Sequence, residues 1–237
     1  MTPINDLDFY ITPDHKCSYL PDKQSKALFT DPNVPMNTKL YSRLTHTGFR
    51  RSGEHVYRPL CDTCNACIPI RLPVTLFTPN KQQKRIWRKN SDLTVSQMKG
   101  APTQEHYALY EKYITMRHRD GDMYPPNEQQ FHSYLFSSWS NTPCYEFRTT
   151  LDNSLLAVAV VDQIELSLSA VYTFFDPLIK KRSLGVYALL WEIELTKSLG
   201  LPHLYMGYWI KQCKKMSYKG NYRPLEVFIN NQWLMLL

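Results

Sequence analysis

Short runs of alternating polar and apolar residues fill the first 75 residues, which are rich in proline, cysteine and tyrosine. Two of these runs, residues 54–60 and 68–74, are typical of strands. A basic segment follows at residues 81–90, where five cations surround Trp87, and it is either a junction between lobes or an exposed helix. The pattern therefore predicts a β-rich N-terminal lobe over residues 1–80, which contains a cysteine cluster.

Helical spacing of apolar residues begins after the basic segment. It runs from residue 103 to 119, is interrupted by a proline-containing loop at residues 122–126, and resumes as a second helix over residues 129–139. Three strands are expected next, over residues 144–150, 155–161 and 164–175. Short turns separate these strands, so we expect an antiparallel meander.

The last part of the chain alternates between strand and helix. The third strand ends at Asp176, a basic turn follows, and an amphipathic helix is expected over residues 184–199, closed by Gly200. A further strand covers residues 204–210. This order is found in acyl-transferring domains of the N-acetyltransferase fold, so residues 81–237 are predicted to form an acetyltransferase-like (GNAT-like) catalytic lobe. The expected class is α/β (α+β) with a mixed sheet.

The chain is long enough and apolar enough to bury a core, with 237 residues of which 43% are hydrophobic. Lys and Arg total 28 against 21 Asp and Glu, which gives a formal net charge of +7. This excess favours a polyanionic partner, because basic clefts attract phosphate backbones. A solvated basic surface without a partner explains the charge equally well.

The location of the protein is predicted to be cytoplasmic. Residues 1–16 are acidic and broken by prolines, unlike a secretion signal. The longest apolar run, residues 155–161, is far shorter than the ~20 residues that cross a bilayer, so no membrane partner is expected. The clustered cysteines do not resemble a disulfide framework, which is consistent with a reducing compartment.

The cysteine cluster is a candidate metal site. The sequence Cys61-Asp-Thr-Cys64-Asn-Ala-Cys67 supplies three thiols at two-residue gaps, and Cys17 is a candidate for the fourth. Thiolates are suitable ligands for Zn²⁺ or an iron–sulfur cluster. Buried or redox-active thiols, or a disulfide, are the alternatives.

Candidate chemistry is densest between residues 171 and 187. Asp176 follows a strand, where open α/β sheets place their sites, and Gly185 permits a ligand to approach a helix N-terminus. Three cations just before that helix are candidates to hold the phosphates of a tRNA acceptor end. An ordinary turn followed by a solvated basic loop accounts for the same residues.

Aromatic and basic residues are interleaved from residue 205 to 219, as in sites that bind single-stranded nucleic acid. Tyr208 and Trp209 are candidates to stack on a terminal adenosine, and a buried aromatic strand is an equally good interpretation. The complete set of candidates for the tRNA and its aminoacyl end is Lys180, Lys181, Arg182, Ser183, Tyr187, Tyr208 and Trp209.

Several phrases occur together and in order along the chain: Cys17-Ser-Tyr-Leu-Pro21, Gly48-Phe-Arg-Arg-Ser-Gly53, residues 57–71, Asp120-Gly-Asp-Met-Tyr-Pro-Pro126, Tyr172-Thr-Phe-Phe-Asp-Pro177, Arg182-Ser-Leu-Gly-Val-Tyr187 and Leu204-Tyr-Met-Gly-Tyr-Trp-Ile210. With them the chain resembles, over nearly its whole length, the arginyl-tRNA-protein transferase family and most closely its bacterial branch, the aspartate/glutamate leucyltransferases. It departs from the eukaryotic arginyl enzymes at Leu20, which stands in place of a second cysteine.

The resemblance implies an aminoacyltransferase that moves leucine from leucyl-tRNA to the N-terminal Asp or Glu of an acceptor protein. It further implies that the acceptor is marked for degradation, as in the N-degron pathway. No DNA partner is expected. Leucine as the transferred group rests on the resemblance alone.

The chemistry of such a transfer needs little base catalysis, because a free α-amine has a pKa of about 7.7 to 8.0. We expect Asp176 to orient or deprotonate the acceptor ammonium, and backbone N–H groups near Gly185 to stabilise the oxyanion. The acidic N-terminal side chain needs a cationic partner, and bidentate pairing favours arginine. Arg71 and Arg85 are the candidates, because they flank the expected junction of the lobes. No cofactor is expected to be required.

Three other functions stay open at this point. The first keeps the reaction and takes arginyl-tRNA as the donor. The second keeps the fold and makes the chain an acetyl-CoA-dependent N-acetyltransferase. A non-enzymatic RNA-binding module organised by a metal is the third.

Overall fold

A computed structural model describes residues 7–237 of the chain. Residues 1–6, which belong to the acidic segment that is unlike a secretion signal, lie outside the described part. Within residues 7–237, none of the helices has the length and apolar character that crossing a membrane requires.

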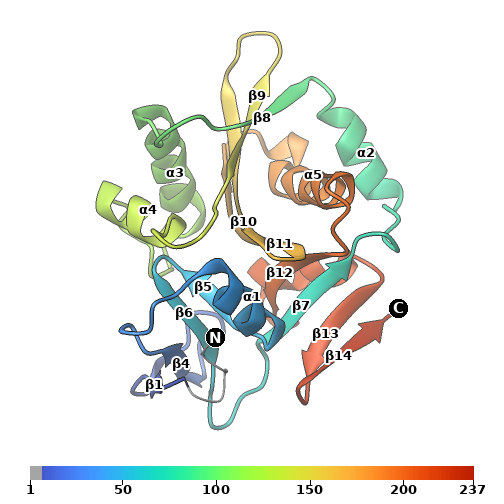
Figure 1. The fold of residues 1–237 in the computed structure, drawn as a ribbon. Coiled ribbons are helices and arrows are strands. Elements are labelled where there is room, and N and C mark those ends of the chain that lie inside the picture. Colours follow the sequence, from blue (N-terminus) through green and yellow to red (C-terminus); the bar gives the residue numbers. More distant parts are fainter. Residues whose placement is uncertain (1–6) are drawn as a thin grey trace.

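The N-terminal part of the chain forms a small antiparallel sheet with the strand order β1-β4-β6-β5 (Figure 1). These strands are β1 (Phe9–Ile11), β4 (Ala27–Thr30), β6 (His55–Pro59) and β5 (Arg50–Ser52). A separate pair, β2 (His15–Lys16) and β3 (Gln24–Ser25), carries the loop that contains Cys17. Helix α1 (Thr38–His46) packs its buried Leu40, Tyr41 and Leu44 in the core next to this sheet.

A mixed eight-stranded sheet organises the rest of the molecule, with the order β14-β13-β7-β12-β11-β10-β9-β8. Its strands are β7 (Ile68–Pro73), β8 (Leu93–Gln97), β9 (Cys144–Thr149), β10 (Leu155–Ile164), β11 (Ser167–Phe175), β12 (His203–Trp209), β13 (Leu225–Ile229) and β14 (Gln232–Leu236). All neighbouring strands are antiparallel except β11 and β12, which are parallel and joined through a helix.

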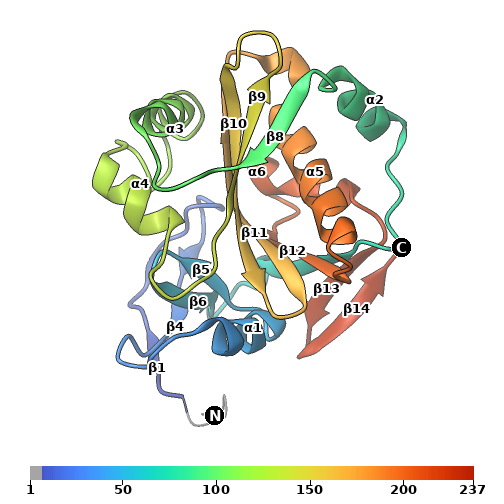
Figure 2. The same ribbon diagram turned by 45° about the horizontal axis from the view of Figure 1, so that its top comes forward.

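Helices cover both faces of the large sheet (Figure 2). On one face, α3 (Gln104–Arg117) and α4 (Glu128–Leu135) pack against one side of β10 and β11. On the other face, α5 (Leu184–Ser198) packs against the sheet, and α2 (Lys81–Lys89) packs on α5. Strand β10 is almost fully buried because both of its faces are covered, which explains its nearly unbroken apolar sequence.

The order of elements expected for residues 81–237 is confirmed. Strands β9, β10 and β11 form the antiparallel meander, and α5 and β12 follow in the expected places. Two boundaries were wrong. Ile164 ends β10 rather than beginning the third strand, because the turn falls at residues 165–166. The second helix ends at Leu135, because Phe136 has extended backbone angles.

Strand β7 belongs to the first 80 residues and yet lies inside the large sheet, between β13 and β12. The two sheets therefore do not follow the predicted division of the chain at residue 80. That division into two lobes stays a prediction.

A buried ion pair joins the two sheets. Arg51 of β5 donates from Nε and Nη2 to the two carboxylate oxygens of Asp162 in β10, at 2.8 and 2.7 Å. The two side chains are 0% and 1% exposed. Arg51 also donates to the carbonyl oxygen of Leu135 at the end of α4, and Thr142 donates to Asp162. Both charges are thus neutralised and hydrogen-bonded, the condition under which a buried pair is tolerated.

Replacing Asp162 by Asn should lower the free energy of unfolding by about 3 to 5 kcal/mol, because Arg51 would be left buried and unpaired. Urea denaturation followed by circular dichroism measures the loss. Glu194→Gln is the matched control, since it breaks the exposed pair with Lys197, where Nζ and Oε1 are 2.9 Å apart. That control should cost less than about 1 kcal/mol. Equal losses in the two variants would show that Arg51 and Asp162 do not hold the sheets together.

Candidate active site

The parallel strands β11 and β12 diverge along their length. They pair only from Ser167 to Ser169 and from His203 to Tyr205, although both strands continue for several residues. Bulges fall on both sides of this gap, at Val171 in β11 and at Met206 in β12. The gap between β11 and β12, which we call the splay, therefore exposes backbone polar groups that cannot pair across the sheet.

Two cations satisfy these groups. From the β11 side, Arg50 donates to the hydroxyl of Ser169 at 2.7 Å and to the carbonyl oxygen of Ala170. From the β12 side, the ammonium of Lys219 donates to the carbonyl oxygens of Met206 and Tyr208, at 2.7 and 3.0 Å. The interior of the splay is consequently positively charged.

Gly207 makes room for one of these cations. Its φ of +76° is unfavourable for other residues, and a Cβ at this position would lie 3.4 Å from Nε of Arg50. A larger residue would therefore strain the strand and crowd the guanidinium.

A buried carboxyl group faces the same region. Glu192 of α5 is 1% exposed, and its Oε1 has no hydrogen-bond partner within the described part of the chain. Burial raises the pKa of Glu192 to about 8, although Arg50 and Lys219 act in the opposite direction. Burial, together with Arg50, lowers the pKa of Lys219 to about 7. At neutral pH, Glu192 therefore holds a proton, and Arg50 lacks an ionised carboxylate within ion-pairing distance among residues 7–237.

Three segments meet at one end of the site: the loop that contains Ser18, a middle loop over residues 118–122, and the short helix α6 (Lys214–Ser217). Ser18 donates to Asp122 at 2.7 Å, and Lys215 pairs with Asp120 at 2.6 Å. His118, in the middle loop, lies 3.2 Å from the hydroxyl of Tyr113. Burial and the nearby Lys215 and Arg117 lower the pKa of His118 to about 4, so it is neutral at physiological pH.

Asp176 lies directly after β11, as the sequence indicated. One carboxylate oxygen accepts from Lys112 of α3 at 2.7 Å, and the other accepts the backbone N–H of Leu178 at 2.9 Å. Gly185 lies close by on the α5 side, where an added Cβ would be 2.9 Å from the ring of Phe175. The glycine thus allows the first turn of α5 to pack on the residue that precedes Asp176.

The cations Lys180 to Arg182 form a short 3₁₀ helix, η2 (Lys180–Arg182), before α5. Lys180 and Lys181 are exposed, whereas Arg182 is half-buried and pairs with Asp92. Ser183 has a left-handed backbone, with φ of 54°, and its carbonyl oxygen accepts the N–H groups of Val186 and Tyr187. The N-terminus of α5 therefore points its first amides into a cationic turn.

The aromatic candidates are mostly part of the core. Tyr187 is 5% exposed and packs against Trp87 and Phe147. Tyr208 is equally buried and donates to the carbonyl oxygen of Gly48 at 3.1 Å. Trp209 is half-buried, and its Nε1 donates to the carbonyl oxygen of Ser217 at 3.3 Å. Their role in binding the tRNA end stays a prediction.

The two arginines expected to bind the acidic N-terminus lie apart. Arg71 is buried in β7, pairs with Glu226 and stacks on Trp233, with its guanidinium carbon 4.3 Å from the ring centroid. Arg85 is exposed on α2. Their role in binding the acceptor stays a prediction. The guanidinium of Arg71 is already paired with the carboxylate of Glu226 in this arrangement.

Five of the six cysteines lie near enough to interact electrostatically: Cys17, Cys61, Cys64, Cys67 and Cys213. Burial raises the pKa of Cys67 to about 12, and the thiols of Cys17, Cys61 and Cys64 add to the shift. All six thiols are free. In the part of the chain that the structure describes, no three His, Cys, Asp or Glu side chains stand in a geometry that holds a metal ion. A zinc or iron–sulfur site therefore stays a prediction.

Three charged residues of the splay were not among the sequence candidates: Arg50, Glu192 and Lys219. Glu192 carried a detectable signal, because it interrupts the apolar sequence of α5 on the face that is buried. Arg50 belongs to a phrase that carried the family resemblance, but no spacing rule connects it with β11. Lys219 was indistinguishable from its neighbouring lysines.

Two family models match the chain. Residues 15–85 match the family described as "Arginine-tRNA-protein transferase, N terminus", and residues 105–229 match its C-terminal counterpart. The aspartate/glutamate leucyltransferase of Saccharophagus degradans is 54% identical over 237 residues, 100% of both chains. That of Pseudomonas fluorescens (strain Pf0-1) is 52% identical over 236 residues, also 100% of both chains.

A third relative, the aspartate/glutamate leucyltransferase of Alcanivorax borkumensis, is 53% identical over 98% of this chain and 96% of its own. Among solved structures, "The structure of L-PGS from Bacillus licheniformis" aligns with 61% of this chain and 47% of its own, at 10% identity and a TM-score of 0.47.

The chain belongs to the arginine-tRNA-protein transferase family. The expectation of an enzyme that uses an aminoacyl-tRNA and a protein acceptor is thereby confirmed.

The protonation of Glu192 predicts a pH dependence of stability. Between pH 5 and 7 the folded protein keeps a proton on Glu192 that the unfolded chain releases, so the free energy of unfolding falls as pH rises. Lys219, whose pKa is lowered to about 7, starts to lose its proton in the folded protein only near pH 7, and this loss offsets a small part of the decrease, about 0.4 kcal/mol. Glu192→Gln should remove a decrease of roughly 2 kcal/mol between pH 5 and 7, measured by urea denaturation. An identical slope in the parent and the variant would show that Glu192 is ionised in the folded protein.

Proposed function

We propose that this protein transfers leucine from leucyl-tRNA to the α-amino group of proteins that begin with Asp or Glu. The observation that carries the proposal is the similarity to the aspartate/glutamate leucyltransferase of Saccharophagus degradans, 54% identical over all 237 residues. Family membership by itself leaves arginyl-tRNA as the alternative donor. It favours an aminoacyl-tRNA over acetyl-CoA, and catalysis over simple RNA binding.

The reaction joins an amine to an ester carbon. The α-amine attacks the carbonyl carbon of the aminoacyl ester, the bond to the ribose oxygen breaks, and a proton passes from the attacking nitrogen to that ribose oxygen, which leaves as a hydroxyl. Positioning the two substrates supplies much of the rate, because the ester is already activated. Backbone N–H groups in the first turn of α5, near Gly185, would stabilise the negative charge on the carbonyl oxygen.

Asp176 would hold the acceptor ammonium beside the ester. Lys112 and the N–H of Leu178 fix its two carboxylate oxygens, which supports an orienting role rather than that of a strong base. The exposed Lys180 and Lys181, with Arg182 and Ser183, would bind the phosphates of the acceptor end. Trp209, which is half-buried, is better placed than Tyr187 or Tyr208 to meet its terminal base.

Recognition of the acidic side chain needs a cation without a carboxylate partner. Arg50 meets this requirement best, because its guanidinium lies in the splay and Glu192 beside it is protonated at neutral pH. We therefore propose Arg50 as the reader of the N-terminal Asp or Glu, next to the candidates Arg71 and Arg85. A protonated Glu192 would donate to the same carboxylate.

The biological setting follows from the donor. Aminoacyl-tRNA is a cytoplasmic substrate, so we propose that the transfer takes place in the cytoplasm. The added leucine would mark the acceptor for degradation, as in the N-degron pathway. No step of this chemistry passes through the cysteine cluster.

The purified protein should move labelled leucine from leucyl-tRNA to peptides that begin with Asp or Glu, and not to one that begins with Ala. Counting the label on each peptide tests donor and acceptor together. Transfer from arginyl-tRNA but not from leucyl-tRNA would change the donor. Absence of transfer from both would contradict the proposal.

Two variants should separate chemistry from recognition. Asp176→Asn is expected to lower the single-turnover rate with saturating substrates by roughly 10²-fold or more, as expected for a lost catalytic positioning group. Arg50→Gln should instead lower the preference for Asp over Ala peptides, because the acidic side chain loses its partner. Arg71→Gln and Arg85→Gln are the comparison variants.

An unchanged single-turnover rate in folded Asp176→Asn protein would exclude the role of Asp176. If Arg71→Gln or Arg85→Gln protein loses the preference for Asp peptides and Arg50→Gln protein keeps it, then Arg71 or Arg85, and not Arg50, binds the acidic side chain.

A further inference from the structure

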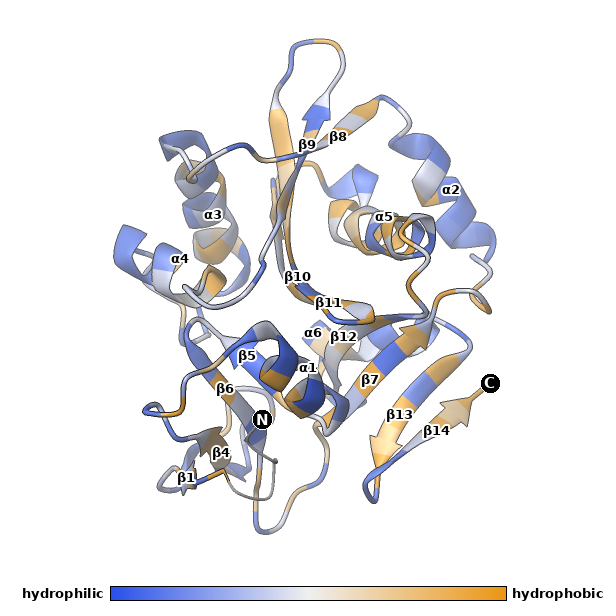
Figure 3. Ribbon diagram, viewed as in Figure 1, coloured by the Kyte–Doolittle hydropathy of each residue, from blue (hydrophilic) through white to orange (hydrophobic). Residues whose placement is uncertain are grey.

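Helix α2 carries a dense run of positive charge. Its nine residues include five exposed cations and no acid: Lys81, Lys84, Arg85, Arg88 and Lys89. In residues 7–237, none of these five cations is engaged in an ion pair. Figure 3 shows the helix as a hydrophilic segment at the periphery of the molecule. The fold itself therefore makes no use of this charge.

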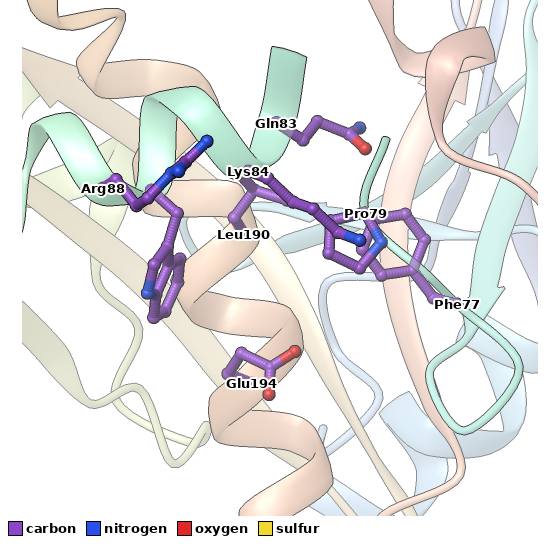
Figure 4. Close-up of a pocket in the computed structure, with 8 residues that line it drawn as sticks. Phe77, Pro79, Gln83, Lys84, Arg88, Leu190 and Glu194 are labelled. Carbon is purple, nitrogen blue, oxygen red and sulfur yellow. The ribbon is translucent and has the colours of Figure 1, made fainter. Parts of the chain in front are cut away.

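A cavity of about 560 Å³ lies between α2 and α5 (Figure 4). Its apolar residues are Phe77, Pro79, Trp87 and Leu190, and its polar residues are Gln83, Lys84, Arg88 and Glu194. Glu194 is already paired with Lys197, so Lys84 and Arg88 determine the charge of the rim. The cavity thus combines an apolar and aromatic floor with two unpaired cations.

Trp87 is available to a ligand. The residue is 38% exposed, and its ring packs against that of Tyr187 at an angle of 54°, with ring centroids 5.4 Å apart. A partly exposed aromatic ring that lines a cavity beside cations can stack on a nucleobase.

The same surface continues to the start of α5. The side-chain amide of Asn90, at the end of α2, donates to the carbonyl oxygen of Arg182 at 2.9 Å, and Asp92 pairs with the guanidinium of Arg182. These contacts fix α2 to η2, although Asn90 and Arg182 are 92 residues apart in sequence. The cations of α2 and of η2 therefore form one surface, which leads to the turn proposed to hold the aminoacyl end.

We propose that this α2–η2 surface binds the acceptor arm of the donor tRNA. Lys84 and Arg88 contact backbone phosphates, and an unpaired base enters the cavity and stacks on Trp87. The proposal rests on the proposed function for the identity of the RNA. It adds a binding site beside the catalytic region, of the kind in which lysines track the backbone and an aromatic ring holds a base.

The test measures binding of deacylated leucine tRNA by filter binding over a range of salt concentrations. The double variant Lys84→Glu/Arg88→Glu should raise Kd about tenfold or more at ~0.1 M salt. It should also reduce the slope of log Kd against log salt by about 1.4 to 1.8, since each of the two lost phosphate contacts contributes ~0.7 to 0.9. Lys39→Glu/Lys99→Glu is the control, because both lysines are exposed and the charge change is the same.

Trp87→Leu separates stacking from charge. This variant keeps an apolar side chain at the edge of the core and removes the aromatic face. It should raise Kd roughly fivefold to 150-fold, which corresponds to the ~1 to 3 kcal/mol of one stacked base. Its salt slope should equal that of the parent, because no phosphate contact is lost.

The outcomes distinguish this inference from the proposed function. Normal leucine transfer by the parent, with unchanged Kd and salt slope in the α2 variants, would overturn the inference and leave the function intact. Equal weakening by the control pair would also overturn it, because the effect would then be one of net charge. A parent that neither binds tRNA nor transfers leucine would instead contradict the function. Urea midpoints confirm that each variant is folded.

Discussion

The ion pair between Arg51 and Asp162 is the constraint on which the rest of the structure depends. It fixes the small sheet to the centre of the large one, and its other hydrogen bonds hold the end of α4. Successive residues of a strand point to opposite faces. With Arg51 bound to Asp162, the neighbouring Arg50 is therefore directed to the other side, where it reaches Ser169 and Ala170 in the splay. One buried pair in this way places a second cation in the candidate active site.

The splay between β11 and β12 interrupts the hydrogen bonding of the sheet, and this interruption creates the candidate site. Backbone carbonyl groups that lose their partners at the divergence must find other donors. Lys219 and Arg50 supply them, so the opening stays positively charged in a buried region. Burial keeps a proton on Glu192 in spite of these neighbouring cations, because it raises the pKa of the carboxyl group more than they lower it. A cationic interior with a protonated carboxyl group can bind an anionic ligand. The carboxylate of an N-terminal Asp or Glu side chain is such a ligand.

The proposed donor and acceptor sites meet at Phe175. Asp176 follows this residue directly, Gly185 packs on its ring, and Arg117 stacks over it at 5.5 Å from the guanidinium carbon to the ring centroid. The first turn of α5, η2 and α2 then form a continuous cationic path that leads away from the centre. A long polyanion bound along this path would present its end at Asp176, and a small acidic N-terminus would enter from the splay.

The sequence by itself determined the elements and their order. Strand and helix periods, together with Gly200, located β9 to β12 and α5, because these patterns reflect local backbone preference and burial on one face. It also brought Asp176, Lys180 to Arg182 and Gly185 together, since they are neighbours in the chain. The sequence motifs shared with the family indicated the class of reaction. The short strands β1 to β5 escaped detection, because two to four residues carry too little periodicity.

Only the tertiary structure decided which distant charges meet. Arg50, Glu192 and Lys219 come from three segments, and their encounter depends on the divergence of two strands. The sequence made Arg71 a candidate to bind the acidic N-terminus, yet the pairing of β7 with β13 places its guanidinium against Glu226. The link between α2 and η2 likewise spans 92 residues. Such contacts are set by packing and strand register, which are properties of the whole fold and leave no periodic trace in the chain.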